Sequence, residues 1–345
     1  MLEMSNRIKS FFVRETHPHR GLMAYEWVVM GYLLATLLYV LVMYHRLPNA
    51  SSMLTQRVCI LGGTLALWGL YRLMPCKALR VVRAGLQVTL LGRWYPDIFE
   101  INRIFPNLDH LFASWEQAIF GCQPALLFSQ HCSSAFFSEL MCLGYSSYYP
   151  LVAVVVVYYL FFREKEFERA IYVILGAFFL HYVLFILMPV TGPQFYYEAV
   201  GMDQIAEGVF PNLHDYFNYH QDRMTCPGYA DGFFYSLVES AHEAGERPVA
   251  AFPSSHVSIC TVLMILAWRS RKLFFCMLPF AILLFFSTVY IRAHYAIDAL
   301  AGLMSGALSY WLLTRPGNSG NSGNSGESGK PGKPGKSGES GKPGI

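Results

Sequence analysis

Long apolar segments alternate with shorter polar ones along most of the chain, and this pattern predicts a membrane protein. A helix that crosses the hydrocarbon of a bilayer needs about 20 predominantly apolar residues. Seven segments meet this requirement: 25–44, 57–75, 138–162, 170–189, 253–268, 273–291 and 295–314. An eighth segment, 81–98, is weaker because Arg83 and Arg93 interrupt it. We therefore predict an all-α fold, a polytopic membrane helix bundle with about eight transmembrane helices.

The distribution of basic residues favours eight crossings over seven. Cytoplasmic loops carry an excess of lysine and arginine. Four basic clusters lie at the N-terminus and between apolar segments: Arg7, Lys9, Arg14 and Arg20; Arg72, Lys77, Arg80 and Arg83; Arg163, Lys165 and Arg169; and Arg269, Arg271 and Lys272. Eight crossings with both termini inside put all four clusters on the cytoplasmic side. Seven crossings would put the basic N-terminus outside.

This topology divides the chain into three parts. Residues 1–80 form an N-terminal segment and an accessory transmembrane hairpin, and residues 81–315 form a six-helix core. Within the core, the loop 191–250 lies on the non-cytoplasmic side and is too long for a simple connection, so we expect short helices in it. In 316–345 glycine occupies every third position, as in collagen. Because the run is short and proline occurs in only some triplets, we expect a disordered low-complexity tail.

Two features of the outer segments remain open at this stage. The stretch from Trp94 to Pro124 places charged and aromatic residues among apolar ones at helical spacing. It is either an interfacial amphipathic helix on the outer leaflet or a packed lid without contact to lipid. Cys122 and Cys132 also lie outside, where disulfides persist, and they are the more natural pair for one.

Titratable residues at the ends of apolar segments suggest the chemistry. They lie in two strings, Ala251-Phe252-Pro253-Ser254-Ser255-His256 and Tyr290-Ile291-Arg292-Ala293-His294-Tyr295-Ala296-Ile297-Asp298. Charged or titratable side chains at membrane depth are costly and usually mark a functional site. On a helix, Asp298 shares a face with His294 four residues earlier. The carboxylate can then accept the Nδ1 proton and leave Nε2 of His294 free as a nucleophile.

The neighbouring residues suit a phosphate. His256 follows Ser254 and Ser255 at an expected helix start, where serines cap and backbone N–H groups attract anions. Arg292 adds a planar cation that fits phosphate oxygens. One histidine can attack phosphorus while the other protonates the leaving oxygen. This scheme requires no metal and no cofactor.

The two strings resemble the second and third signature motifs of the type 2 phosphatidate phosphatase superfamily. The arginine placement is similar to that in the branch of inositol-phosphorylceramide synthases and related lipid phosphotransferases. The resemblance is strong over Phe252–Leu303 and diffuse over 81–194. It implies that the six-helix core is catalytic, with His294 as the nucleophile, Asp298 as the residue that orients it and His256 as the acid.

The chain also departs from the pattern of the phosphatases. Ser255 stands where they often have glycine, and Thr288 stands where they have an arginine. Their first motif, rich in lysine and arginine, is not recognisable, and Pro189-Val190-Thr191-Gly192-Pro193-Gln194 lies in its place. We therefore expect Arg292, Ser254, Ser255 and Gln194 to bind the phosphate. Arg223 of the long loop could reach it too, although a salt bridge within the loop is the more ordinary role.

The expected function is transfer of a phosphoryl-headgroup, with phosphoinositol as the headgroup, from a phospholipid to a lipid alcohol such as ceramide through a phosphohistidine. The alternative is a lipid phosphate phosphatase that uses the same residues with water as the acceptor. A non-catalytic transporter or scaffold is a third reading, because intramembrane charges also mark transport paths. The expected partners are these lipids and the bilayer, not nucleic acid. The site is expected on the periplasmic or lumenal face.

Overall fold

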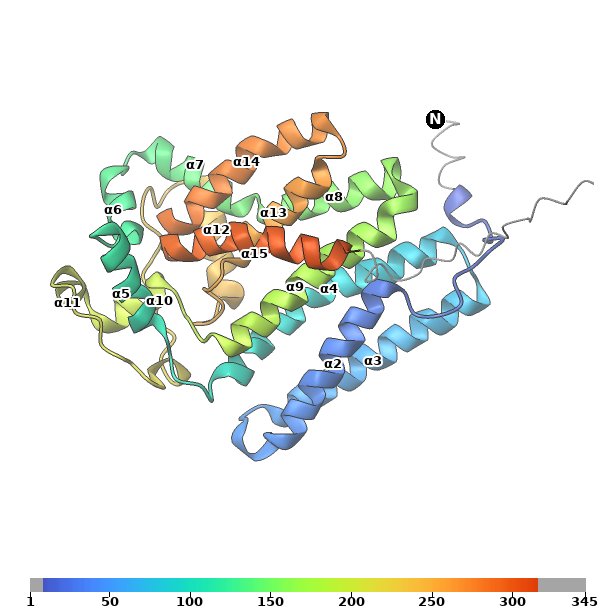
Figure 1. Cartoon of the computed structure of the whole chain (residues 1–345), viewed down its shortest axis with the longest axis horizontal. Coiled ribbons are helices and arrows are strands. Elements are labelled where there is room, and N and C mark those ends of the chain that lie inside the picture. Colours follow the sequence, from blue (N-terminus) through green and yellow to red (C-terminus); the bar gives the residue numbers. More distant parts are fainter. Residues whose placement is uncertain (1–8, 316–345) are drawn as a thin grey trace, which may run out of the picture.

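The regular structure of residues 9–315, the part of the chain that the computed structural model describes, is helical and contains no strand (Figure 1). The tail at 316–345 lies outside the described residues. The α-helices are α2 (Ala24–Val42), α3 (Ala50–Leu73), α4 (Lys77–Asn102), α5 (Asp109–Phe120), α6 (Pro124–His131), α7 (Ala135–Ser146), α8 (Tyr148–Phe162), α9 (Phe167–Leu187), α10 (Pro193–Val200), α11 (Met202–Ala206), α12 (Phe233–Gly245), α13 (Ser255–Ala267), α14 (Arg271–Tyr290) and α15 (Ala296–Thr314). Three short 3-10 turns occur at Tyr44–Arg46, Glu164–Glu166 and Tyr216–Asn218.

Each of the eight predicted segments contains helix, and several of these helices can cross a membrane. By length and composition, five qualify as spans: α2, α3, α9 with the turn before it, α14 and α15. The helices α7 and α8 form a sixth if their pair, bent by 44°, counts as one span. α13 is short, with 13 residues, and α4 carries six charged residues. The prediction of a multi-pass helical membrane protein is confirmed, with five or six qualifying spans where eight crossings were expected.

Charged residues of α4 lie inside the bundle in pairs with α2 and α3. Arg83 forms a buried ion pair with Glu26 of α2. Arg57 of α3 donates from Nη1 to Asp97 Oδ2 at 2.8 Å. Buried charges persist when they are paired and hydrogen-bonded. Arg83, one of the two arginines that interrupt 81–98, and Asp97 therefore join α4 to the N-terminal hairpin of α2 and α3. Figure 1 shows this hairpin beside α4.

Close packing of α13 on α15 brings the two motif strings together. A Cβ added to Gly302 would lie 2.8 Å from the carbonyl oxygen of Ser254, and one added to Gly306 would lie 2.5 Å from that of Ser258. Small residues spaced by four let two membrane helices approach closely. α9 packs on both helices, and His181 Nε2 lies 3.1 Å from Ser305 Oγ.

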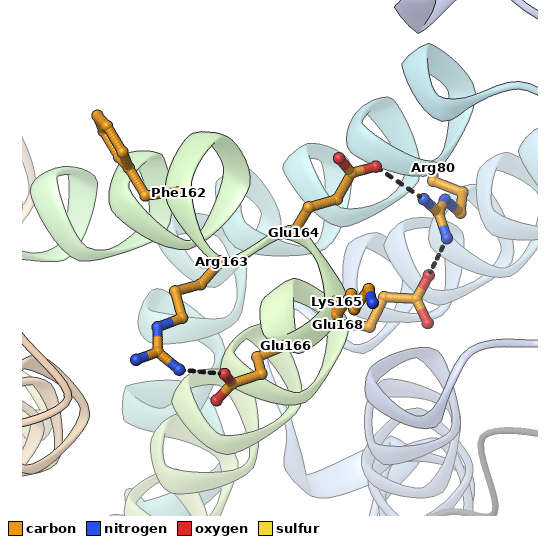
Figure 2. Close-up of a pocket in the computed structure, with 7 residues that line it drawn as sticks. All are labelled: Arg80, Phe162, Arg163, Glu164, Lys165, Glu166 and Glu168. Carbon is orange, nitrogen blue, oxygen red and sulfur yellow. Dashed lines mark hydrogen bonds and ion pairs between the residues drawn. The ribbon is translucent and has the colours of Figure 1, made fainter.

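Members of all four basic clusters meet at the end of the bundle remote from these motifs, where Arg72 also donates to the carbonyl oxygen of Arg20 at 3.0 Å. A cavity of about 670 Å³ lies there between the start of α4 and the α8–α9 connection. Figure 2 shows Arg80 between Glu164 and Glu168, and Arg163 against Glu166. Arg163 Nη2 also lies 3.5 Å from the carbonyl oxygen of Arg269. Because the arginines of this cavity already face carboxylates, it is a poor phosphate site.

Two expectations for the outer segments need correction. The expectation of a disulfide between Cys122 and Cys132 is wrong, because both cysteines are free. The eight-residue helix α6 stands between them, and its length of about 12 Å exceeds the Cα separation of about 4.4–6.8 Å in a disulfide. The stretch from Trp94 to Pro124 is also not one helix. Its first part continues α4 as far as Asn102, and α5 begins at Asp109.

Candidate active site

The two motif histidines are in direct contact. His256 lies in the first turn of α13, and His294 lies in the tight turn between α14 and α15. His256 Nδ1 is 3.4 Å from His294 Nε2, and the ring centroids are 5.6 Å apart. His294 is buried and His256 partly buried. The fold therefore brings together the two side chains that the sequence assigns to nucleophile and acid.

The Nδ1 side of His294 faces two oxygens. The carbonyl oxygen of Ala251 is 2.7 Å away, and Asp298 Oδ2 is 3.8 Å away. Asp298 Oδ2 also accepts the backbone N–H of Tyr295 at 2.9 Å. The nearer hydrogen-bond acceptor is thus a backbone carbonyl, and Asp298 lies beside it at longer range. Both oxygens favour the tautomer with the proton on Nδ1 and a free lone pair on Nε2.

Burial lowers the pKa of His294 to about 4. A buried imidazole loses the hydration that stabilises its charged form, so the neutral ring predominates. At pH 7 the Nε2 lone pair therefore needs no prior deprotonation. A neutral histidine in contact with a second histidine can act as a nucleophile.

Arg292 lies in the same turn as His294, two residues before it. It adopts a left-handed conformation with φ 66°, which a non-glycine residue takes up rarely. Its Nη2 donates to Ser129 Oγ at 3.3 Å, and its Nε is buried without a hydrogen-bond acceptor. Among the described residues no carboxylate lies within ion-pair distance of it. Part of its hydrogen-bonding capacity is thus unused by the protein.

Three of the other four predicted phosphate ligands, Ser254, Gln194 and Arg223, have partners within the fold. Ser254 Oγ accepts the Val257 N–H at 3.4 Å and caps α13, while Ser255 is the first residue of that helix. Gln194 donates from Nε2 to Glu246 Oε1 at 2.6 Å. Arg223 forms an ion pair with Glu239 at 2.5 Å, which is the loop salt bridge that the sequence also suggested. Arg223 is therefore bound to a carboxylate of the loop and not directed to the histidines.

Two residues of the long outer loop, Glu246 and His242, form a polar cluster that the sequence reasoning missed. Glu246 Oε2 lies 2.9 Å from His242 Nε2, and its Oε1 accepts from Gln194. Burial raises the pKa of Glu246, but its interactions with His242, Gln194 and His256 together outweigh this effect, so the net pKa is lowered. The ring of Tyr145 packs against both His242 and His256, with ring centroids 5.7 and 4.7 Å away. The four-residue spacing of His242 and Glu246 was the available signal.

A second missed residue is Asp109, at the start of α5. It is fully buried, and its oxygens accept from the backbone N–H groups of Thr191 and Gly192 at 2.6 and 2.8 Å. They also accept from the hydroxyls of Thr191 and Tyr295 at 2.9 and 3.0 Å. Asn107 Nδ2 donates to it as well, at 2.6 Å. One carboxylate thus ties the segment around Gly192 to the loop that carries His294.

Glu116 makes a similar connection two turns further along α5, on the same face as Asp109. Its two oxygens accept from the N–H groups of Ala296 and Ile297 at 3.1 and 3.3 Å, which caps the start of α15. An adjacent face of α5 exposes apolar side chains, including Trp115 at 49% and Ile119 at 65%. α5 is therefore packed over the site through its acidic face, as in the lid reading. Its outer face is apolar, as an interfacial helix requires.

Comparison with known proteins agrees with this geometry. A family model described as the PAP2 superfamily, the type 2 phosphatidate phosphatase superfamily, matches residues 110–312. This range contains His256, Arg292, His294 and Asp298. No curated protein and no solved structure matches the chain.

Proposed function

Because the chain belongs to the PAP2 superfamily, whose membership supports lipid phosphatase or phosphotransferase activity, we propose that it is the transferase. It moves a phosphoryl-headgroup, with phosphoinositol as the expected headgroup, from a phospholipid to a lipid alcohol such as ceramide. The alternative, hydrolysis of a phosphomonoester or pyrophosphate lipid, uses the same histidines. The choice rests on the charges around them.

The observation that carries the proposal is the balance of charge near His294. Arg292, two residues before His294, has no carboxylate partner among the described residues, and the segment 189–194 contributes no basic side chain. The carboxylate of Glu246 lies in the same cluster. A phosphodiester carries one negative charge, whereas a phosphomonoester carries up to two near pH 7. One arginine beside a carboxylate therefore suits the phosphodiester of a phospholipid better.

The transfer consists of two displacements at phosphorus. His294 Nε2 forms a bond to phosphorus while the bond from phosphorus to the diacylglycerol oxygen breaks, and His256 gives that oxygen a proton. The acceptor hydroxyl then loses its proton to His256 as its oxygen bonds to phosphorus and the phosphorus–nitrogen bond breaks. His294 is regenerated neutral and His256 protonated, so atoms and charges balance. Each proton transfer of this kind contributes typically about 10²–10⁴-fold to a rate.

The contact between the rings implies a movement on substrate binding. At 3.4 Å the two nitrogens leave no room for a phosphoryl group between them. We therefore expect the His256 and His294 rings to separate as the phosphate enters, with the rings of Tyr145 and Tyr148, which already pack against His256, adjusting to the change. Reacting atoms approach to about 3–3.5 Å in such complexes.

We further propose that the site faces the periplasm or a lumen and that both termini are cytoplasmic. The support is the positive-inside rule. The clusters around Arg80, Arg163 and Arg269 gather at the end of the bundle remote from His294. The loop 191–250 covers the histidine end.

The test is incubation of the purified protein with labelled phosphatidylinositol, with and without ceramide, followed by mass analysis of the lipids. The proposal predicts an inositol-phosphorylated sphingolipid that forms only when ceramide is present, and none with His294→Ala. A parallel incubation with phosphatidate measures release of inorganic phosphate. Phosphate release without any sphingolipid product would favour the phosphatase. Inactivity of a folded protein on both donors would favour the transporter or scaffold reading.

A further inference from the structure

Three potential metal ligands converge in the long outer loop. Cys226, Glu239 and His242 each offer one donor atom, and the three atoms lie within 4.8 Å of one another. Glu239 and His242 are three residues apart on α12, so they lie on one face of that helix. Cys226 lies in the segment that precedes it. Among residues 9–315 this is the group that brings three such donors together.

The spacing of these atoms suits zinc. Zinc binds cysteine sulfur at about 2.3 Å and histidine nitrogen or carboxylate oxygen at about 2.0–2.2 Å, usually in a tetrahedron. Two ligands of one such ion therefore lie about 3.3–3.8 Å apart. Cys226 Sγ is 3.8 Å from His242 Nδ1. A small rotation of the Glu239 side chain completes a three-residue ligand set.

The surroundings of His242 are those of a metal-bound imidazole. Its other nitrogen, Nε2, lies 2.9 Å from Glu246 Oε2. Histidines that bind metals almost always present their second nitrogen to a carboxylate, a carbonyl or water, which fixes the tautomer and the ring orientation. Both Cys226 and His242 are 5% exposed, so the site is enclosed by protein.

We infer that Cys226, Glu239 and His242 bind a zinc ion that fastens the outer loop to the active site. The mixture of sulfur, nitrogen and oxygen donors favours zinc over magnesium or calcium, which prefer oxygen alone. The fastened segment touches residues of the site. Met224 Sδ lies 4.0 Å from Arg292 Nη1, and the Met224 N–H donates to the Gln194 carbonyl at 2.9 Å. The ion acts on the position of the loop and takes no part in the transfer.

Arg223 offers a competing explanation for the place of Glu239. The two form an ion pair at 2.5 Å, and Glu239 Oε1 also accepts the Cys226 N–H at 2.6 Å. If the ion pair alone explains the position of Glu239, no metal is bound, and the Cys226 thiol and the His242 imidazole are only in packing contact. The variant Arg223→Gln separates the two explanations, because it removes the ion pair and keeps all three donors.

The experiment measures bound zinc in the full chain purified in detergent, by elemental mass spectrometry after exposure to zinc and removal of the excess. We expect about one zinc per chain in the wild type and in Arg223→Gln. In Cys226→Ser and His242→Gln the amount of zinc bound per chain should fall at least tenfold. Cys260→Ser is the matched control, since Cys260 is equally buried in α13, at 4% exposed, and lies outside the cluster. Thermal melting checks that each variant is folded.

Cobalt substitution in the wild type supplies a second measurement that needs no folded variant. A cysteine thiolate bound to cobalt gives a charge-transfer absorption in the near ultraviolet, whereas nitrogen and oxygen ligands alone do not. We expect this absorption, and we expect added zinc to abolish it. The proposal is overturned if the folded wild type holds less than a tenth of a zinc per chain and shows no such band. It is equally overturned if Cys226→Ser keeps the full zinc content.

Discussion

Asp298 shares its task at His294 with the carbonyl oxygen of Ala251, and this sets the size of the expected mutational effects. His294→Ala removes the proposed nucleophile and should abolish transfer. Asp298→Asn keeps an oxygen for the Tyr295 N–H, so the fold should remain. Loss of the carboxylate costs about 10⁴-fold where it alone orients the histidine. Here the carbonyl at 2.7 Å also holds the tautomer, so we expect a loss of roughly 10²-fold in kcat.

The measurement is turnover of labelled phosphatidylinositol at saturating ceramide, with melting curves as the check on folding. Near-normal turnover by a folded His294→Ala would remove this histidine from the nucleophile role. A loss as large for Asp298→Asn as for His294→Ala would show that the carbonyl does not share the task.

Arg292 is expected to bind the phosphate as a planar cation. A guanidinium presents parallel donors to two oxygens, whereas an ammonium is a compact point charge. Arg292→Lys should therefore recover only part of the activity lost in Arg292→Ala. If Arg292 merely anchored the helix end at the interface, lysine would serve equally well by extending its charge to water. Turnover of both variants at saturating lipid separates the two roles, and wild-type activity in Arg292→Lys would refute the phosphate contact.

At the scale of elements, α5 holds two segments of the site in place through one carboxylate. Asp109→Asn keeps the size of the side chain but replaces an acceptor oxygen with an NH₂ group that faces donors. A buried donor left unsatisfied costs about 1–3 kcal/mol. Because at least one of the donors around Asp109 loses its acceptor, we expect the protein to be destabilised by about 2–3 kcal/mol, with a matching fall in melting temperature.

The control for Asp109 is Asp203→Asn, because Asp203 is exposed at the start of α11. It should melt like the wild type. If Asp109→Asn melted at the same temperature as this control, its hydrogen bonds to Thr191, Gly192 and Tyr295 would contribute little to stability.

Glu116 gives the fold a dependence on pH that can be measured. Burial raises the pKa of Glu116 to about 8, from about 4.5 in an unfolded chain. Between these values the folded state binds the additional proton, so stability decreases as pH rises through this window. We expect the melting temperature of Glu116→Gln to gain on that of the wild type between pH 5 and pH 9. The buried His294 has the opposite slope below pH 6.5, but it is present in both proteins and cancels in the difference. A difference that does not change with pH would contradict the raised pKa.

The sequence predicted the motif helices well and the contacts of the outer segments poorly. The apolar segments predicted the helices, because hydrophobic runs are local properties. The strings around His256 and His294 predicted that the two histidines act on one phosphate, because each string resembles a family motif. The partners of Asp109 and Glu116 could not be predicted. Their donors lie 82 residues away for Asp109 and Thr191, and 180 for Glu116 and Ala296. A carboxylate on an amphipathic helix looks the same in sequence whether it faces water or caps another helix.

Across the whole molecule, charged pairs join the N-terminal hairpin to the core. Arg57 with Asp97 and Arg83 with Glu26 are all nearly buried, at 8% side-chain exposure or less. Removing one partner of such a pair is costly, about 3–5 kcal/mol, because it leaves an uncompensated buried charge. The hairpin is therefore bound to α4 through matched charges on three helices. Since α4 also packs on α9, the hairpin and the helices of the motifs form one assembly.

The direction of this assembly in the membrane is the last prediction, and it can be tested with two exposed positions. Lys165 lies at the end of the bundle with the basic clusters, and Asp222 lies in the loop over the histidine end; both side chains are exposed. In sealed vesicles whose interior is cytoplasmic, a membrane-impermeant maleimide should label Asp222→Cys at once. It should label Lys165→Cys only after permeabilisation. The wild type, with its native cysteines, sets the background. The reverse pattern would place the histidines on the cytoplasmic side and would contradict the positive-inside assignment, because the Lys/Arg excess would then lie outside.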